Sequence, residues 1–181
     1  MPQLSGRRIS DGLFFLSGGP FVSIVQDMKI KSDSEKTTRR IAAILAEEIV
    51  RTKKAREAFV VALQGDLGSG KSTFARGFIR GCGIKARVPS PSFLIYRRYS
   101  TRNPKFNFEN IYHLDLYRLQ KNAAANELKK LGWDEIVRGR NIVLIEWADK
   151  TRGLIPKNSM RVTFFYGREE NERIISIKSR R

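Results

Sequence analysis

The residues best suited to chemistry lie in one short stretch of the chain, "VVALQGDLGSGKSTFARGF". Its centre has the spacing of a Walker A motif, in which four residues separate Gly65 from Gly70 and Lys71 and Ser72 follow. Glycines in such a turn allow positive φ angles and let backbone N–H groups approach a phosphate closely. The lysine supplies a cation for the β- and γ-phosphates, and the serine hydroxyl suits Mg²⁺. The stretch predicts a phosphate-binding loop, whose expected ligand-binding residues are Gly65, Asp66, Gly68, Ser69, Gly70, Lys71, Ser72 and Thr73.

Such a loop requires a strand before it and a helix after it. The apolar run "AFVVALQ" is typical of a buried strand, and Phe74, Phe78 and Ile79 recur at helical spacing. The positive end of that helix's dipole would point at the same anion as the loop. A chance glycine turn would not be expected to combine all of these features.

Two further apolar segments end in a carboxylate, which is what a nucleotide-hydrolysing site needs near its metal and attacking water. Residues 142–145 lead to Glu146, and residues 111–114 lead to Asp115. In an open sheet, strand ends beside the phosphate loop face the ligand crevice. Glu146 is therefore the Walker B candidate, whereas Asp115 alone fits either a second site acid or a cap or turn residue. His113, the only histidine, fits an ordinary sheet position, and we do not expect it to be catalytic.

The remaining pattern predicts an α/β fold, a single-domain P-loop NTPase with three layers and a mixed parallel and antiparallel sheet. We expect strands at 28–31, 141–147, 160–167 and 172–179, and a hairpin formed by 93–100 and 106–117. We expect one helix that begins with a capping box of Ser32 and Glu35 and ends near Lys54, and a short helix closed by Gly132. The ATPase domain should span residues 28–181. Residues 1–27 should be a disordered extension or follow from an upstream start, with an extra hairpin as the less favoured interpretation.

Composition limits the class of protein further. The chain has 181 residues, a formal net charge of +17 and one cysteine, so it can form no intrachain disulfide. We expect Cys82 to be a small buried residue, and we expect a reducing cytoplasm and no membrane span. The excess of basic residues favours polyanions such as RNA, although a merely solvated basic surface is an equal alternative.

The motifs together resemble one family. "GDLGSGKSTFARGF", "VPSPSF", "YHLDLYRL", "LGWDEI" and "IVLIEWADK" occur in an order and spacing similar to the TsaE (YjeE) family, over roughly residues 29–150. The resemblance implies a small ATPase that binds ATP or ADP with Mg²⁺ and is required for threonylcarbamoyladenosine in tRNA. It also implies TsaD and TsaB as partner proteins, and tRNA reached through that complex.

The resemblance assigns roles to individual residues. It implies that Ser72 and Glu146 are Mg²⁺ ligands and that Asp115 is the essential acid near the γ-phosphate, with Lys71 as a third catalytic residue. Trp147 is implied to lie beside the nucleotide, and Thr37 near its base. Residues that would sense the γ-phosphate are Ser90, Ser92 and Arg118; Ser92 replaces the threonine usual in the family.

Other functions remain to be weighed against this one. A small GTPase would need a guanine-reading Asn/Thr-Lys-x-Asp segment and an Asp-x-x-Gly switch, and the sequence has neither. A small-molecule or nucleotide kinase would need a basic lid, for which "VRGRN" or "GREENER" are the available segments. An RNA-binding module with a merely structural nucleotide is a third alternative. Phosphate transfer to an acceptor, release of free phosphate, or neither, separates the three.

Overall fold

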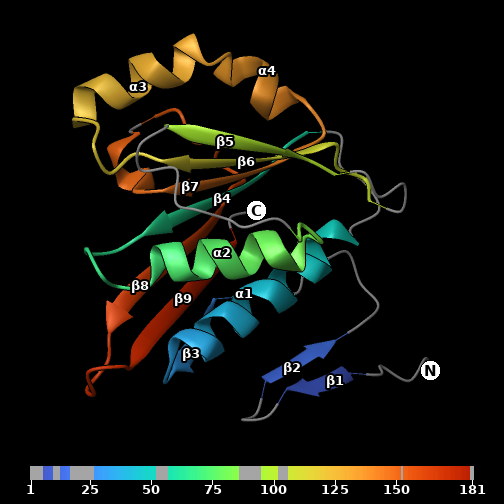
Figure 1. Cartoon of the computed structure of the whole chain (residues 1–181), viewed down its shortest axis with the longest axis vertical. Coiled ribbons are helices and arrows are strands. Elements are labelled where there is room, and N and C mark those ends of the chain that lie inside the picture. Colours follow the sequence, from blue (N-terminus) through green and yellow to red (C-terminus); the bar gives the residue numbers. More distant parts are fainter. Residues whose placement is uncertain are drawn as a thin grey trace.

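A computed structural model describes residues 6–9, 13–16, 27–51, 57–85, 95–101, 106–151 and 153–179. Its main feature is a seven-stranded sheet in the order β3-β9-β8-β4-β7-β6-β5 (Figure 1). The strands are β3 (Met28–Ser32), β4 (Phe59–Gln64), β5 (Tyr96–Ser100), β6 (Asn110–Asp115), β7 (Asn141–Glu146), β8 (Met160–Tyr166) and β9 (Arg173–Ser179). The helices are α1 (Glu35–Val50), α2 (Lys71–Gly81), α3 (Lys121–Lys130) and α4 (Trp133–Arg138), with a 3₁₀ turn, η2 (Ala148–Lys150).

The centre of the sheet is parallel and its edges are antiparallel. Strand β4 runs parallel to β7 and β8, and β7 runs parallel to β6. At one edge β5 pairs antiparallel with β6, and at the other β9 joins β8 and β3 in antiparallel fashion. The predicted mixed sheet is thus confirmed. The predicted hairpin of residues 93–100 and 106–117 is confirmed by the pairing of β5 with β6. Because β4, β6 and β7 are parallel, the carboxyl ends of these three strands lie side by side at the same end of the sheet.

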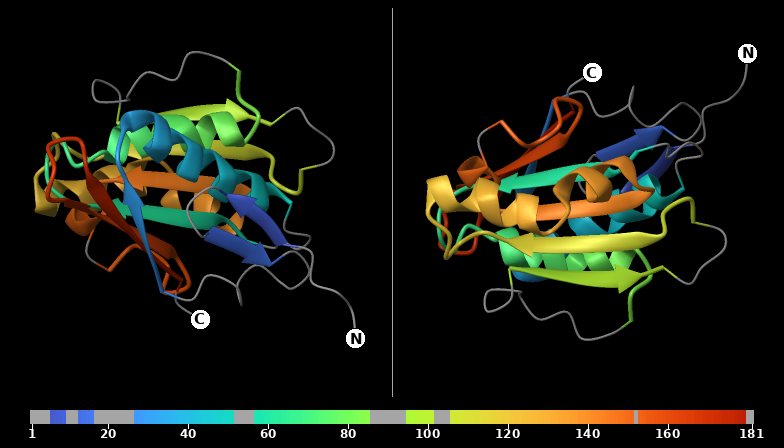
Figure 2. Two further views of the ribbon diagram at one scale, coloured as in Figure 1. Left: turned by 90° about the horizontal axis from the view of Figure 1, so that it is seen from below. Right: turned by 90° about the horizontal axis from the view of Figure 1, so that it is seen from above.

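Helices cover both faces of the sheet, which gives the three layers predicted (Figures 1 and 2). Helices α1 and α2 lie on one face, over a core that includes Phe74, Phe78 and Leu144. Helices α3 and α4 lie on the other face, over a core that includes Leu114 and Val143. The alternation of side chains along the buried strands supplies both cores from the same segments.

Helices α1 and α2 pack closely because two glycines of α2 leave room for the backbone of α1. A Cβ atom on Gly77 would lie 2.5 Å from the carbonyl oxygen of Arg39, and one on Gly81 would lie 2.4 Å from that of Ala43. Both distances are too short for any side chain. The orientation of α2, which carries Lys71 and Ser72 in its first turn, thus depends on these two glycines.

The start of α1 differs from the prediction. Its N-cap is Ser34, whose side chain accepts a hydrogen bond from the backbone N–H of Thr37 at 3.1 Å. The predicted capping box of Ser32 and Glu35 is therefore wrong. The Ser32 side chain instead lies buried at the end of β3 and hydrogen bonds Thr38 at 2.7 Å. Helix α1 ends at Val50, and the predicted end near Lys54 lies outside the described residues.

The N-terminal segment contains an element ranked second in the sequence analysis. Residues Gly6–Ile9 (β1) and Leu13–Leu16 (β2) pair antiparallel as a two-stranded sheet, separate from the seven-stranded sheet. This pairing corresponds to the hairpin that the sequence offers as the less favoured interpretation of the segment. The position of the true start, and the domain boundary at residue 28, stay predictions.

Two elements beyond β6, helix α4 and the 3₁₀ turn η2, were not predicted. Helix α3 ends as expected before Gly132, which has a φ of +74°. A second helix, α4, begins at once with Trp133, and its indole N–H donates to the carbonyl oxygen of Leu154 at 3.1 Å. The 3₁₀ turn η2 follows β7 directly. No helix in the described part of the chain is long and apolar enough to cross a membrane.

Candidate functional site

The glycine-rich loop, residues 65–72, joins the carboxyl end of β4 to the start of α2. Its three glycines have positive φ angles: +136° at Gly65, +76° at Gly68 and +104° at Gly70. A Cβ atom on Gly65 would also lie 2.6 Å from the carbonyl oxygen of Phe164 in β8. Glycine is thus required by conformation at all three positions and by space at the first. The strand, turn and helix occur as predicted, and the phosphate itself stays a prediction.

The end of the β8–β9 hairpin supports this loop from outside. The Tyr166 hydroxyl donates to the carbonyl oxygen of Leu67 at 2.5 Å. The Arg173 guanidinium donates to the carbonyl oxygen of Gly68 at 3.3 Å and lies 4.8 Å from the centroid of the Tyr166 ring. Two carbonyls at the apex of the loop are therefore held by side chains from the last two strands. Sequence reasoning did not predict this role, because nothing local in the sequence links the two segments.

Lys71 lies inside the loop and is 4% exposed. Its ammonium donates to the carbonyl oxygens of Gly65 at 2.8 Å and Asp66 at 2.6 Å. The ammonium also lies 3.9 Å from the centroid of the Trp147 ring, within the range of a cation–π contact. Burial lowers the pKa of Lys71, and the nearby carboxylates, Glu146 most of all, oppose that effect. The lysine is thus a cation held on weak neutral partners at the point where a phosphate is predicted.

Glu146, at the end of β7, connects the sheet to the loop. One carboxylate oxygen accepts a hydrogen bond from the Ser72 hydroxyl at 2.5 Å, and the role of the two residues as metal ligands stays a prediction. The other oxygen lies 2.9 Å from Nε2 of His113. The side chains of Glu146 and His113 are each 1% exposed.

His113 contacts the predicted site carboxylate Glu146, a contact that the sequence does not predict. Its buried place in β6 agrees with the sheet position predicted from the alternation of its neighbours. The same alternation places His113 and Asp115 on one face of β6, and β6 lies beside β7 with Asp115 opposite Glu146. A signal for His113 was therefore present, but it depended on which strand is the neighbour of β6.

Asp115 has features of both predicted roles, the second site acid and the cap or turn residue. It is 7% exposed, at the predicted edge of the sheet and in register with Glu146. Its Oδ1 atom also accepts a hydrogen bond from the backbone N–H of Tyr117 at 3.0 Å, so it shapes the turn after β6. The turn role is observed, and the role as site acid stays a prediction.

An aromatic and cationic cluster closes one side of the site. Trp147 has a φ of +59°, the only positive φ of a non-glycine residue among those the structure describes. Its ring lies 5.2 Å from that of Tyr117, between centroids, and the Lys150 ammonium lies 5.5 Å from the Trp147 ring. Lys150 also donates to the carbonyl oxygens of Tyr117 and, at 2.9 Å, Leu119. Trp147 thus lies among Tyr117, Lys150 and Lys71, and a left-handed backbone at a bulky residue indicates strain of the kind that accumulates at functional sites.

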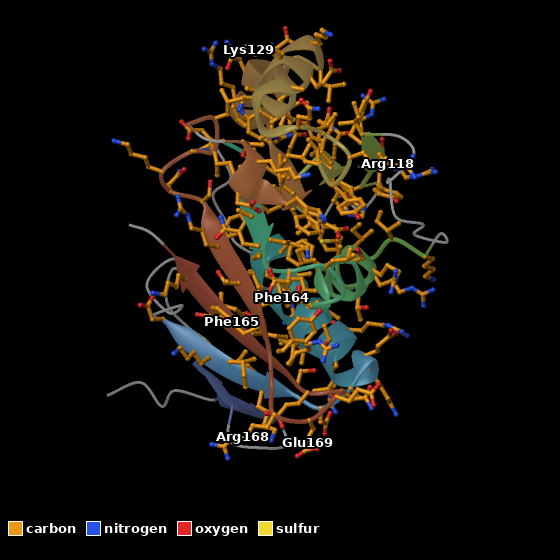
Figure 3. All side chains as sticks on the ribbon, turned by 90° about the vertical axis from the view of Figure 1, so that its left-hand side faces the viewer. Arg118, Lys129, Phe164, Phe165, Arg168 and Glu169 are labelled. Carbon is orange, nitrogen blue, oxygen red and sulfur yellow. The ribbon has the colours of Figure 1, made fainter. Side chains whose placement is uncertain are left out.

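The other predicted residues are placed as follows. Thr37 lies in the first turn of α1, where its hydroxyl donates to Asp33 at 2.7 Å; no observed contact brings it to the loop. Thr73 is buried in α2. Arg118 lies in the turn after β6 and is labelled in Figure 3. Ser90 and Ser92 lie outside the described residues.

The donor set bears on the predicted Mg²⁺. In the described ranges, no cluster of three or more His, Cys, Asp or Glu side chains could hold a metal ion alone. Ser72 and Glu146 provide one hydroxyl and one carboxylate. Mg²⁺ at nucleotide sites commonly takes only one or two protein oxygens, with phosphate and water supplying the rest. The residues present fit that mode and do not fit a metal bound by protein alone.

Comparisons with known proteins agree with the fold and with the motifs. A model of the family described as threonylcarbamoyl adenosine biosynthesis protein TsaE matches residues 32–175. The chain is 31% identical over 138 residues to the tRNA threonylcarbamoyladenosine biosynthesis protein TsaE of Bacillus subtilis (strain 168), which covers 76% of this chain and 77% of that protein. It is 34% identical over 147 residues to the protein of the same name from Rickettsia typhi (strain ATCC VR-144 / Wilmington), with coverages of 81% and 91%.

A solved structure gives the same result for the fold. The crystal structure of Bacillus subtilis YdiB superposes with a TM-score of 0.64 at 28% identity, and the match covers 85% of this chain and 86% of that one. The matched family region contains the glycine-rich loop, both strand-end carboxylates, His113 and Trp147. The chain therefore belongs to the TsaE family of threonylcarbamoyl adenosine biosynthesis proteins.

Proposed function

We propose that this protein binds ATP or ADP with Mg²⁺ at the glycine-rich loop and hydrolyses ATP slowly. We further propose that the ATPase cycle serves tRNA threonylcarbamoyladenosine formation by resetting a complex with TsaD and TsaB. The observation that carries the proposal is the hydrogen bond of 2.5 Å between Ser72 and Glu146, 74 residues apart in the sequence. It joins the predicted metal-binding hydroxyl to the predicted Walker B carboxylate.

Each group of residues in the site has its own role in hydrolysis. The loop N–H groups and the Lys71 ammonium bind the β- and γ-phosphates, as the charge of such a ligand requires. Ser72 and Glu146 would hold Mg²⁺, which supplies charge neutralisation for the developing transition state. Asp115 orients the attacking water and takes up its proton, while the water oxygen bonds to the γ-phosphorus and ADP leaves.

Resting contacts of Lys71 fit a ligand-binding role better than a purely structural one. A structural lysine at 4% exposure would be expected to pair with a carboxylate, since an unpaired buried charge is unfavourable. Here its partners are two loop carbonyls, the Ser69 hydroxyl at 3.4 Å and an indole ring, all of which are weaker partners than a phosphate. A polyphosphate can therefore displace these partners at little cost in free energy.

The test compares two lysines. Lys71→Ala should abolish tight binding of a fluorescent ADP analogue, measured by titration in the presence of excess Mg²⁺. Lys129→Ala is the matched control, because Lys129 lies on α3, on the far face of the sheet from α2, and is exposed (Figure 3). Near-normal affinity in Lys71→Ala would defeat the assignment of the loop.

A second measurement separates an ATPase from a kinase. The protein is mixed with ATP, alone and with TsaD, TsaB and unmodified tRNA, and the fate of the γ-phosphate is followed. We expect free phosphate, with a yield of modified tRNA that depends on this protein. Phosphate on an acceptor would instead indicate a kinase, and modification that is independent of the protein would remove the tRNA role.

A further inference from the structure

We propose that His113 is a positioning residue for the site. It holds the Glu146 carboxylate against Ser72 and away from Lys71, so that the hydroxyl is ready for a metal and the ammonium is ready for a phosphate. This inference rests on the proposed function, since it assigns His113 a part in nucleotide and Mg²⁺ binding at the same loop.

The first argument is the hydrogen-bond chain from His113 through Glu146 to Ser72. An ionised carboxylate only accepts hydrogen bonds, so Nε2 of His113 carries the proton and donates to Oε1 across 2.9 Å. The other carboxylate oxygen is then left for the Ser72 hydroxyl at 2.5 Å. A hydroxyl has one hydrogen, and its use in this bond directs the lone pairs of Ser72 away from Glu146. The donor at one end of the chain thus sets the orientation of the oxygen at the other.

The second argument is burial. Both His113 and Glu146 have side chains that are 1% exposed, so water does not readily replace a lost donor. Nδ1 of His113 has no hydrogen-bond partner among the residues described, so Nε2 makes the one polar contact observed for this ring. An apolar side chain would be enough to fill this sheet position. A buried imidazole whose single polar contact is with a site carboxylate therefore indicates a role toward that carboxylate. Outer-shell donors of this kind set the orientation and strength of a metal ligand.

The third argument concerns the charge beside Glu146. Lys71 lies close enough that Glu146 is the carboxylate with the largest effect on it. Even so, no ion pair joins Lys71 and Glu146 in the described part of the chain, because the ammonium lies on the carbonyl oxygens of Gly65 and Asp66. An unheld carboxylate would be attracted to that ammonium in a poorly solvated site. Such a pair would compete with phosphate for Lys71 and would turn Glu146 away from Ser72.

The fold provides the geometry for this role. Strands β6 and β7 are parallel neighbours, and the register places Asp115 opposite Glu146 and His113 opposite Leu144. His113 therefore reaches Glu146 diagonally, from two residues before the end of its strand. Tyr112 lies on the opposite face of β6, half-buried, with its ring centroid 6.4 Å from that of Tyr96. Adjacent positions of one strand thus offer a variant in the site and a control outside it.

The experiment uses the full chain and measures binding of a fluorescent ADP analogue as Mg²⁺ is varied, so that no turnover is required. His113→Leu removes the donor, whereas His113→Gln keeps an amide N–H near the position of Nε2. Tyr112→Phe controls for changes in β6. We expect His113→Leu to raise the half-saturating Mg²⁺ concentration about 10–100-fold. His113→Gln should recover most of the loss, and Tyr112→Phe should match the wild type.

A double variant tests the link to Lys71. His113→Leu should also weaken ADP binding without Mg²⁺, because Glu146 then competes for the ammonium. Adding Glu146→Gln removes that charge and should restore the Mg²⁺-free affinity of the leucine variant. A merely structural role for His113 predicts no such rescue, since a second substitution in the core would only add to the damage.

The outcomes distinguish this inference from the proposed function. A wild-type protein that binds no ADP would overturn both. Normal ADP binding with an unchanged Mg²⁺ midpoint in His113→Leu, or equal losses in the leucine and glutamine variants, would overturn the role of His113 alone. If His113→Leu does not fold, His113→Asn serves in its place, because its amide is too short to reach Oε1. An unchanged midpoint in that variant would likewise overturn the proposal.

Discussion

The Tyr166 hydroxyl donates a hydrogen bond of 2.5 Å to the carbonyl oxygen of Leu67, a residue 99 positions earlier in the sequence. Leu67 lies at the apex of the glycine-rich loop and is 63% exposed. The last two strands of the sheet thus hold the loop that the first half of the chain supplies. Figure 3 shows Phe165, the residue before Tyr166, on the sheet. It also shows Arg168 and Glu169 at the turn beyond β8.

Loss of this hydrogen bond should weaken the site without unfolding the protein. Tyr166→Phe keeps the ring and its contact with Arg173 but removes the donor, at a loss typical of one hydrogen bond, about 0.5–1.5 kcal/mol. We expect ADP affinity to fall about two- to tenfold by titration, because the apex of the loop is less ordered before binding. Phe165→Leu is the control, since Phe165 is 50% exposed and points to the other face of β8. Equal affinities in wild type and Tyr166→Phe would show that the hairpin does not order the loop.

The charge state of Lys71 should make nucleotide affinity depend on pH. Burial lowers the pKa of Lys71 from 10.5, so the folded apo protein loses this proton at a lower pH than the unfolded chain does. Affinity for ADP should therefore fall as pH rises through that lowered pKa, below 10.5, because only the ammonium attracts the phosphates. Isothermal titration in buffers of different ionisation enthalpy should detect proton uptake on binding in that range. A wild-type affinity that stays constant across this range, with no proton uptake on binding, would contradict the assignment.

The same pKa shift has a consequence for stability with a fixed sign. A lysine whose pKa is lower in the folded state opposes folding while it is protonated, and stability rises with pH wherever the unfolded chain holds more protons. That penalty is fully present below the folded pKa and is relieved as pH rises toward 10.5. The free energy of unfolding of the wild type, relative to Lys71→Met, should therefore rise with pH across this window. A difference that stays constant with pH would show that burial does not shift this group.

Close packing of α1 on α2 should make Gly77 intolerant of a side chain. Gly77→Ala would place a Cβ atom 2.5 Å from the carbonyl oxygen of Arg39, a contact that the helices can relieve only by moving apart. Overpacking of this kind costs about 1–3 kcal/mol, to be measured by chemical denaturation. Arg80→Ala, at an exposed position of the same helix, should change the free energy of unfolding by less than about 0.5 kcal/mol. Equal effects of the two substitutions would show that the interface is adaptable.

Local patterns predicted the parts of this protein that depend on neighbouring residues. The loop, its strand and its helix follow from glycines, Lys71 and apolar periodicity, which all act within a few residues. The true cap of α1 at Ser34 was missed because Ser32 and Ser34 are both suitable, and only the burial of Ser32 against Thr38 selects between them. Helix α4 was missed because it follows α3 across a single turn at Gly132 and is only six residues long.

The contacts that complete the site depend on which strands are neighbours, and no local pattern contains that information. Glu146 and Ser72 could be paired in advance because the Walker motifs carry the relation. The bond from His113 to Glu146 requires β6 beside β7, and that from Tyr166 to Leu67 requires β8 beside β4. Each is a consequence of the strand order 8-4-7-6, which the sequence alone left open.

Asp115 provides the sharpest test of the coupling to tRNA modification. Its carboxylate shapes the turn by accepting from the Tyr117 N–H, and it is the proposed acid beside the γ-phosphate. Asp115→Asn keeps an acceptor for that N–H but removes the charge, whereas Asp115→Ala removes both. We expect the alanine variant alone to lose about 1 kcal/mol of stability. Both variants should retain ATP binding and lose about 10²–10⁴-fold in hydrolysis, the usual contribution of a positioned acid or base.

The readout that matters is modified tRNA formed per complex of this protein with TsaD and TsaB. With either Asp115 variant, we expect modification to stop after the first turnover, because ATP remains bound and the complex is not reset. Because binding linkage is reciprocal, the stalled complex should also hold its partners more tightly with ATP than without it. Equal yields over many turnovers with wild type and Asp115→Asn would rule out the coupling role of this carboxylate. Loss with alanine but not with asparagine would instead assign Asp115 to the turn alone, and would leave another group to organise the attacking water.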